Sequence, residues 1–473
     1  MSCSTIPHQK GKHIVTRPEP QTASLLLIFR ELLPAHAVEN LIKQCAGPFY
    51  RRLFSPVILL WCFIYQRLNP DHTCDAVVSY VGDGGADHLD QQHALPLSQR
   101  MQSESSAAYC KGRKRLPLAL LQAALQHVVR GIQQALPSQG RWLGHPVLLL
   151  DGSSILLTPT PDLVAHYGLH KNGRGNTYWV VARIAAGFCL YSGTLVAVSE
   201  DTLRQSEQAL AKPVLAQALP DSVCVADSNF GVFSVAQAAR HYCLWGLLRL
   251  TRQRAQALAR CTMQSGEDIL ITWTPSAKDK VDARMSADPI AGRLVYVRLV
   301  RPGFRPVDLY LFTTLRDGTR YPVQQLVELY GRRWQVELNL RYVKATLDLA
   351  VLTGKSVDMV RKELVAGLLA YNLMRASIVW AAEAAGQSCL TLSFTRCYRR
   401  IRDHLFRPTV PDSEGTSAAL HQRLLKRLAQ CRLPKRESGR VEPRAVRKRP
   451  GVYPALKGSR TEARQRLLAA AKC

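Results

Sequence analysis

The spacing of apolar residues divides the chain into a helical first part, an α/β middle and a second helical part. From about Ala23 to Leu136 the pattern is helical, apart from a polar, glycine-containing loop at 82–99. The clearest helix repeats apolar residues at steps of three and four, the pattern of one buried face. Its residues are Leu118, Leu121, Leu125, Val128 and Ile132.

Short apolar runs that end on acids or turns begin near Gly144 and predict strands. The predicted strands are 146–151, two segments of 178–198 joined near Gly187, 222–227 and 243–250, with helices at 205–219 and 232–240. This order is typical of an α/β fold with a mixed sheet. A β-rich insertion follows at 251–318, with strands at 268–274, 293–300 and 307–314, and helices resume at 322–349 and 357–382.

The composition points to a polyanionic partner. The chain has 63 Lys and Arg against 35 Asp and Glu, a net charge of +28, and 47% of its residues are hydrophobic. That apolar share excludes wholesale disorder, and nucleic acid is the partner that such a positive charge favours. The rival, a membrane surface, is weaker because the most apolar run, 54–65, is shorter than the roughly 20 residues of a span.

The N-terminus and the cysteines favour an intracellular protein. The first residues lack the apolar core of a signal peptide. The 13 cysteines include no CxxC pair, so neither a disulfide framework nor a zinc site is indicated. We therefore expect reduced thiols and a cytoplasmic location.

Two basic segments are candidates for contact with DNA. The first is a cluster at the start of a predicted helix, which is either a solvated helix start or a DNA-contacting face; it consists of Lys111, Arg113, Lys114 and Arg115. The second lies beyond Arg432, where basic residues stand among prolines, a composition suited to an extended basic arm.

Two acids follow predicted strands. Asp151 and Asp227 each stand at the carboxyl end of a strand, where α/β folds place their ligands. Taken singly, each has another explanation, because Asp151 precedes Gly-Ser and can form a turn, whereas Asp227 can cap the next helix.

A third acid belongs to an ordered polar row. On a regular helix Tyr330, Arg333, Glu337 and Lys344 fall within roughly 60° of one another. The alternative is a ladder of i,i+4 ion pairs from Arg333 through Glu337 to Arg341. That ladder accounts for the charges but leaves the tyrosine and the lysine unexplained.

Together the three acids suit the chemistry of phosphodiesters. Carboxylate oxygens are ligands for Mg²⁺, which leaves room for phosphate and water. Two such ions about 4 Å apart activate an attacking oxygen and stabilise the leaving one. Arg333 and Lys344 would then neutralise neighbouring phosphates.

The row Tyr330, Arg333, Glu337 and Lys344 has the spacing Y-x2-R-x3-E-x6-K. It resembles the signature of DDE transposases of the insertion-sequence-four family, and the likeness extends over roughly 140–385 through the two aspartates and the β-rich insertion. Relatives often have Arg-Gly after the second aspartate, where this chain has Ser228 and Asn229.

The resemblance implies an α/β protein with an RNase H-like catalytic core and a β-rich insertion, flanked by a helical N-terminal domain and a basic, largely helical C-terminal region. The expected parts are a polar tail at 1–20, a helical N-terminal DNA-binding domain at 21–139, the first part of the catalytic core at 140–250, the β-rich insertion at 251–318, the second part of the core with the signature helix at 319–385, and the basic C-terminal region at 386–473.

The resemblance also implies an activity. Such an enzyme binds the terminal inverted repeats of its insertion sequence and, with Mg²⁺ or its substitute Mn²⁺, hydrolyses one strand. The freed 3′-hydroxyl cuts the other strand through a hairpin and then joins target DNA. Asp151, Asp227 and Glu337 would be the catalytic metal ligands, and the phosphate contacts would be Tyr330, Arg333 and Lys344.

The expected partners are double-stranded DNA, as element ends and target, and a second copy of the chain in a synaptic complex. No membrane is involved, and the expected location is the bacterial cytoplasm, associated with the nucleoid. Two alternatives remain, a domesticated or inactive relative that binds DNA without cutting it and a metal-dependent nuclease without strand transfer.

Three further signals are weaker. Trp273 and Tyr310 are candidates for holding a flipped base, although ordinary β-sheet packing explains both better. The sequence at 353–356, TGKS, resembles the end of a P-loop but lacks the motif's first glycine, so no ATP site is predicted.

His166 and His170 have the i,i+4 spacing of a zinc site. No glutamate follows the first histidine, and nearby glycine and asparagine favour a loop. We interpret this loop as lying near DNA, with Lys171 and Arg174 contacting phosphate.

Overall fold

The computed structural model describes residues 29, 31–45, 53–89, 93–135, 140–172, 175–277, 279, 281–300, 306–405, 414–434 and 459–470. The chain divides into two compact units, 1–297 with 308–433 and 298–307 with 434–473. In the smaller unit the described helix is α16 (Arg460–Ala470). The predicted tail at 1–20 and the proline-rich arm around Arg444 lie outside the described residues. All that follows concerns the larger unit, except where β8 and β9 run into 298–307.

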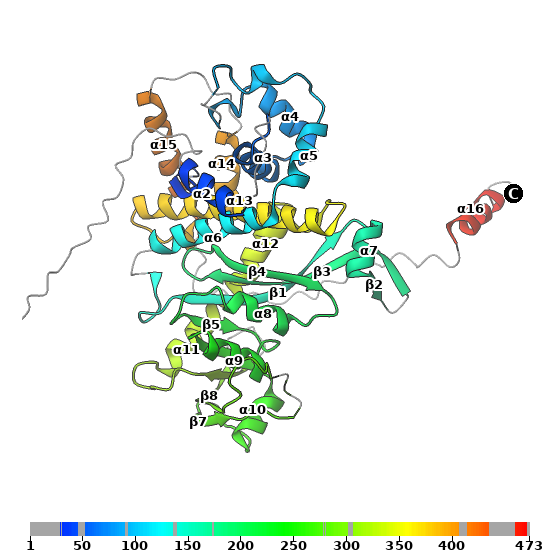
Figure 1. Ribbon diagram of the computed structural model, residues 1–473. Helices are drawn as coiled ribbons and strands as arrows, with labels where there is room; N and C mark the ends of the chain where they lie inside the picture. Colours follow the sequence, from blue (N-terminus) through cyan, green and yellow to red (C-terminus); the bar gives the residue numbers. More distant parts are fainter. Residues whose placement is uncertain are drawn as a thin grey trace, which may run out of the picture. The chain divides into compact units, whose positions relative to one another are not determined.

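A mixed sheet of ten strands forms the centre of the larger unit (Figure 1). Its strands are β1 (Val147–Leu157), β2 (Leu169–Asn172), β3 (Gly175–Cys189), β4 (Leu195–Thr202), β5 (Val223–Ala226), β6 (Trp245–Leu250), β7 (Asp268–Trp273), β8 (Ile290–Leu299), β9 (Val307–Thr313) and β10 (Val351–Leu352). The main order is β2-β3-β1-β5-β6-β9-β8-β7, with β4 beside β3 and β10 beside β1.

Three parallel strands lie in the middle of this sheet. β1 pairs in parallel with β5, and β5 with β6, while β3 and β9 join them antiparallel on either side. Every residue of β5 is buried, as are the first four of β1, because helices cover the sheet. Such continuous apolar runs are typical of central parallel strands.

The β-rich segment at 251–318 extends the same sheet. β9 pairs with β6, and β8 and β7 follow outward. The aromatic residues Trp273 and Phe312 meet edge to face at 4.9 Å within the buried cluster that also lines β1 and β5. The three strands expected in this segment are therefore present, and they share their core with the central strands.

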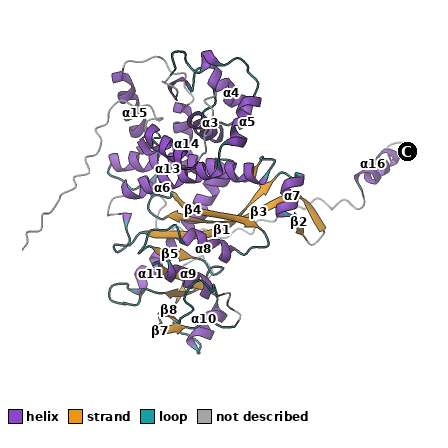
Figure 2. Ribbon diagram, in the orientation of Figure 1, coloured by secondary structure: helices purple, strands orange, loops and turns teal. Residues whose placement is uncertain are grey.

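Helices surround the sheet (Figure 2). They are α2 (Ala35–Cys45), α3 (Pro56–Leu68), α4 (Cys74–Gly82), α5 (Ala107–Arg115), α6 (Leu118–Ala135), α7 (Pro161–Tyr167), α8 (Glu207–Leu215), α9 (Phe233–His241), α10 (Arg252–Ala259), α11 (Val323–Gly331), α12 (Gln335–Arg341), α13 (Val357–Ala384), α14 (Phe394–Leu405) and α15 (Glu414–Ala429). α13 contacts α3, α6 and α15, and Figure 1 shows α6 and α13 running alongside each other between the sheet and the N-terminal helices.

α13 is long and apolar enough to cross a bilayer, but 94% of its most apolar stretch is buried inside the protein. Its buried polar side chains bond to neighbouring elements of the protein, as expected of a core helix. Glu363 accepts hydrogen bonds from Arg67 of α3 at 2.7 Å and from the Gly354 amide at 2.8 Å. Asn372 donates to the Leu195 carbonyl of β4 at 2.9 Å. The helix therefore links the N-terminal helices to the sheet.

Two local predictions were wrong. The segment with His166 and His170 is not a loop, since α7 ends at Tyr167 and β2 begins at Leu169 after a single glycine with positive φ. Pro161 and the Thr160 cap start α7, and pairing with β3 holds β2. Nor does the basic cluster begin a helix, because it forms the last turns of α5.

Candidate active site

The register of the sheet brings Asp151 and Asp227 together. Leu150 of β1 is paired with Ala226 of β5, so the acid that follows each of them stands at the same edge of two adjacent parallel strands. Asp151 is not the end of its strand, as the sequence suggested, because β1 continues along β3 to Leu157. Its parallel pairing with β5 nevertheless stops at Leu150, and this places the acid at the edge.

The segment that carries Glu337 is not the regular helix that the spacing predicted. α11 ends at Gly331, a 3₁₀ turn covers Arg332–Trp334, α12 covers Gln335–Arg341, and a π turn covers Tyr342–Thr346. The wide turn is closed by the Leu347 amide, which donates to the Tyr342 carbonyl at 3.1 Å. The prediction of a continuous helix was therefore wrong in detail.

Two residues of the polar row nevertheless contact β1, and Glu337 is bound to one of them. Arg333 donates from Nη2 to Glu337 Oε1 at 2.6 Å, and its Nη1 lies 3.7 Å from Asp151 Oδ2. Lys344 Nζ donates to Ser153 Oγ of β1 at 3.3 Å. Burial raises the pKa of Tyr330 overall, although Arg249 of β6 lies close enough for its guanidinium to lower that pKa. The row is thus held against β1 and β6, on either side of β5.

The charges of the other two acids reach Asp151. The pKa of Asp151 is raised to about 6, mainly by burial and to a smaller extent by the carboxylates of Asp227 and Glu337. The Gly152 amide, which donates to Asp151 Oδ1 at 2.8 Å, and the Arg333 guanidinium both oppose the shift in this pKa. Asp227 and Glu337 therefore lie close enough to Asp151 to affect its pKa. Shifted pKa values of this kind are common at functional sites.

The donor set suits a hard divalent cation, although the ligands are not gathered around one. Among the residues that the structure describes, no three His, Cys, Asp or Glu side chains already stand at metal-holding distance. Glu337 is turned to Arg333, and its side chain is 60% exposed, so that ion pair is weak and exchangeable. Carboxylate oxygens, such as those of these three acids, are the ligands that Mg²⁺ or Mn²⁺ takes.

A fourth acid was missed in the sequence. Glu207 begins α8, where Ser206 caps the helix by accepting from the Ala209 amide at 3.2 Å. Its carboxylate lies over Gly152, where any Cβ would collide with it, and accepts a hydrogen bond from Asn229. Burial raises the pKa of Glu207 and Asp227 raises it further. Nothing in the local sequence distinguishes it from an ordinary acid in the first turn of a helix.

The two candidate base-binding aromatic residues are packed in the core. Trp273 and Tyr310 are 3% and 4% exposed. Trp273 contacts the rings of Phe233 and Phe312, and Tyr310 stacks on Tyr296 with ring centroids 4.3 Å apart. They fit the β-sheet packing explanation and leave no ring face for a base.

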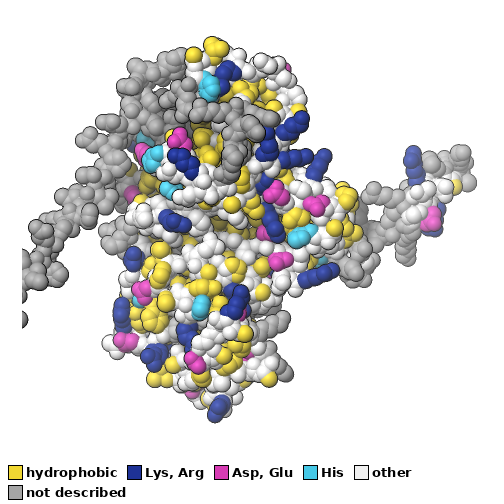
Figure 3. Space-filling model, viewed as in Figure 1, with side chains coloured by type: hydrophobic (Ala, Val, Ile, Leu, Met, Phe, Trp, Pro, Cys, Tyr) yellow, Lys and Arg dark blue, Asp and Glu magenta, His cyan; other side chains and the backbone are white. Residues whose placement is uncertain are grey.

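The basic cluster of α5 splits into an inner and an outer part. Arg113 turns inward, donating to Gln66 Oε1 at 3.0 Å and lying 5.2 Å from the Tyr109 ring centroid. Lys111 and Arg115 instead line a cleft of about 560 Å³ in the helical N-terminal part. Figure 3 shows Lys and Arg side chains gathered where α5 lies. The side chains of the other predicted phosphate contacts, Lys171 and Arg174, lie outside the described residues.

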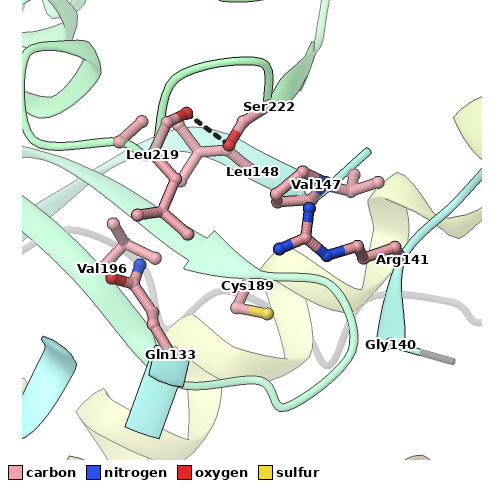
Figure 4. A pocket seen from close by; sticks show the side chains of 11 residues that line it. Gln133, Gly140, Arg141, Val147, Leu148, Cys189, Val196, Leu219 and Ser222 are labelled. Carbon is pink, nitrogen blue, oxygen red and sulfur yellow. Dashed lines mark hydrogen bonds between the residues drawn. The ribbon is translucent and has the colours of Figure 1, made fainter. Parts of the chain in front are cut away.

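Two other features lie apart from the three acids. Glu363 of α13 accepts hydrogen bonds from the amides of Thr353 and Gly354, so the TGKS segment is bound to this helix. A small cavity of about 40 Å³ lies between Val147 and Ser222, at the amino ends of β1 and β5 (Figure 4). Ligand pockets are usually about 300 Å³ or larger. The acids stand at the opposite ends of these strands.

Comparison with known proteins assigns the family. The family described as "Transposase DDE domain" matches residues 142–373. "Transposase InsG for insertion sequence element IS4" of Escherichia coli (strain K12) is 25% identical over 434 residues, which are 88% of this chain and 91% of that protein. A cryo-EM structure of the piggyBac transposase synaptic complex with hairpin DNA covers 88% of this chain and 86% of its own, at 11% identity and a TM-score of 0.40. The domain match and the near-full-length relative place this chain among the DDE transposases of the insertion-sequence-four family.

Proposed function

We propose that this transposase binds the terminal inverted repeats of an insertion sequence and moves it by cutting and pasting DNA. The observation that carries the proposal is that Asp151 and Asp227 follow paired residues at one edge of the sheet, where Arg333 lies 3.7 Å from Asp151 and binds Glu337. In this proposal the central strands and their helices form an RNase H-like catalytic core.

Asp151, Asp227 and Glu337 would hold divalent metal ions, Mg²⁺ or Mn²⁺. When bound, these ions would lower the barrier to attack on a phosphodiester by activating the attacking oxygen and stabilising the leaving one. Glu337 can join the aspartates by exchanging its exposed pair with Arg333. The freed guanidinium would then face the DNA, where its planar donors suit a phosphate.

The reaction would proceed by hydrolysis of one strand, hairpin formation, reopening of the hairpin and joining to target DNA. Water attacks the phosphorus at the element end, the bond to the 3′ oxygen breaks, and a free 3′-hydroxyl remains. That hydroxyl attacks the opposite phosphodiester to form a hairpin, and the flanking DNA leaves with its own 3′-hydroxyl. Water reopens the hairpin and restores the 3′-hydroxyl of the element, which then attacks a target phosphodiester and displaces the 3′ oxygen of the target strand. Lys344 and Tyr330, held against β1 and β6, would contact the phosphates that flank the broken bond.

DNA binding would extend to the helical N-terminal part. The cleft beside α5 is lined by Arg100, Lys111 and Arg115, and none of the described residues that line it is acidic. With the net charge of +28, this supports backbone contacts to duplex DNA. We further propose a homodimer, since two element ends must be held together for joint insertion.

The test uses purified protein and a duplex that carries one candidate element end, with Mg²⁺ or Mn²⁺. Nicks, hairpins and joined products are followed on a denaturing gel for wild type and for Glu337→Gln. Glu328→Gln is the matched control, because Glu328 is an exposed acid of α11 that bonds only to Gln324 among the described residues. We expect wild type and the control to cut, and Glu337→Gln to bind without cutting.

Other outcomes separate the alternatives. If all three proteins bind DNA and none of them cuts it, the chain is an inactive DNA-binding relative. Cleavage without joined products would mark a nuclease. Cleavage that survives Glu337→Gln would place the active site elsewhere.

A further inference from the structure

Arg375 of α13 is a buried cation that has no acidic partner among the described residues. Its side chain is almost entirely inside the protein, at 4% exposure. Nε donates to the Tyr371 hydroxyl at 2.9 Å, and Nη2 donates to Asn339 Oδ1 at 2.6 Å. Neutral acceptors therefore take the place that a carboxylate usually takes beside a buried arginine.

Three aromatic rings enclose the same guanidinium. Its Cζ lies 4.7 Å from the ring centroid of Phe394, 5.3 Å from that of Tyr342 and 5.5 Å from that of Tyr371. Tyr342 and Phe394 also stack on each other, with centroids 4.6 Å apart. Cation–π attraction is strongest where water is excluded, so these rings supply the stabilisation that an acid would otherwise give.

Two of these contacts lead directly to the segment of the catalytic residues. Asn339 stands two residues after Glu337 in α12, and Tyr342 is the first residue of the π turn that contains Lys344. The π turn changes the direction of the side chains that follow it, and such turns occur often at functional sites. Arg375 therefore joins α12 and the first residue of this turn to α13, which also bonds β4 through Asn372.

We propose that Arg375 is a positioning residue for catalysis, which holds α12 and the π turn so that Glu337 and Lys344 face the ends of β1 and β5. The proposal rests on the function proposed above, because it assigns Glu337 and Lys344 to the reaction. Arg375 touches neither DNA nor metal in it. Its effect passes through Asn339 and Tyr342.

The experiment compares Arg375→Met, Arg375→Lys and the control Arg293→Met. Arg293 of β8 is equally buried, at 3% exposure, but it bonds Asp268 and the carbonyl of Tyr321 instead of the catalytic segment. At saturating DNA and metal, we expect the cleavage rate of Arg375→Met to fall about 100-fold, the cost of a small misplacement of reacting groups. DNA affinity should stay within about threefold. Arg375→Lys, which keeps the cation among the rings, should recover part of the rate.

The control should lose stability but keep its cleavage rate per folded molecule. Equal rate losses in Arg375→Met and Arg293→Met would reduce Arg375 to a packing role and overturn the proposal. Asn339→Leu combined with Arg375→Met should lose no more rate than the worse single variant, because both remove the same link. If the rate losses of Asn339→Leu and Arg375→Met add fully in the double variant, the positioning role of Arg375 is also contradicted.

A readout that does not depend on cleavage separates this proposal from the proposed function. Hydrogen exchange of the amides at 342–347 should quicken in Arg375→Met relative to wild type and remain unchanged in Arg293→Met. If wild type does not cut DNA, the proposed function fails while the exchange still reports whether Arg375 holds the turn. Unchanged exchange in Arg375→Met would refute the positioning role.

Discussion

Replacing Asp151 by asparagine should make the metal-free protein more stable near neutral pH. Burial and the carboxylates of Asp227 and Glu337 raise the pKa of Asp151 to about 6 in the folded protein. The unfolded chain returns it to an ordinary value of about 3.9. The folded state thus holds this proton more tightly, and its unfolding free energy falls as pH rises from about 4 through about 6.

The size of the effect follows from that difference in pKa. The ionised Asp151 costs the fold about 3 kcal/mol at pH 7, about 1.5 kcal/mol at pH 5 and about 0.5 kcal/mol at pH 4. Its side chain is only 17% exposed, so solvent screening removes little of this cost. Asparagine keeps the shape and the acceptor for the Gly152 amide but carries no charge, and so it avoids the cost.

The assay is chemical denaturation of wild type and Asp151→Asn with a chelator present, at pH 7 and pH 4. The variant should be the more stable protein at pH 7, and the gain should almost vanish at pH 4. Saturating Mg²⁺ should then stabilise wild type but not the variant, because only the ionised acid is a strong ligand. No gain at pH 7, or an equal gain at both pH values, would refute the electrostatic account of the cluster.

Three further predictions concern other parts of the molecule. Glu363→Gln should lower the unfolding free energy by about 3–5 kcal/mol in urea denaturation, because it leaves the buried Arg67 unpaired. Gly231→Ala should cost about 1–3 kcal/mol in the same assay, since a Cβ there would collide with the Arg249 carbonyl, and an unchanged midpoint would contradict the close approach. Lys111→Ala should lower the slope of log affinity for duplex DNA against log salt by about 1 without changing stability, whereas an unchanged slope would remove the cleft from the DNA interface.

Periodicity predicted much of the fold because it reports burial. β5 and the first residues of β1 are continuous apolar runs, and such runs form the central strands. The apolar pieces between polar turns at 251–318 likewise predicted the strands β7, β8 and β9. What periodicity does not contain is strand order, which long-range packing decides. The pairing of β9 with β6, which makes the segment at 251–318 continuous with the main sheet, was therefore not predicted.

The candidate site shows the same division. The spacing from Tyr330 to Lys344 identified residues that the structure brings to the strand ends, although their roles in catalysis stay a prediction. The 3₁₀ and π turns within that spacing were missed, because an angle of 100° per residue assumes a regular helix. Glu207 was missed because its proximity to Asp227 depends on how α8 packs over Gly152.

The central claim is that Asp151, Asp227 and Glu337 act as one metal-dependent unit. The measurement that tests it most directly is the single-turnover rate of cleavage at an element end with Mg²⁺, for the three single acid-to-amide variants and the double variant Asp151→Asn with Glu337→Gln. Each single variant should lose about 10³-fold or more in rate at equal DNA occupancy, and the double variant should lose no more than the worse single one, as expected for residues that work together. A near-wild-type rate for any one of the three variants would contradict the claim.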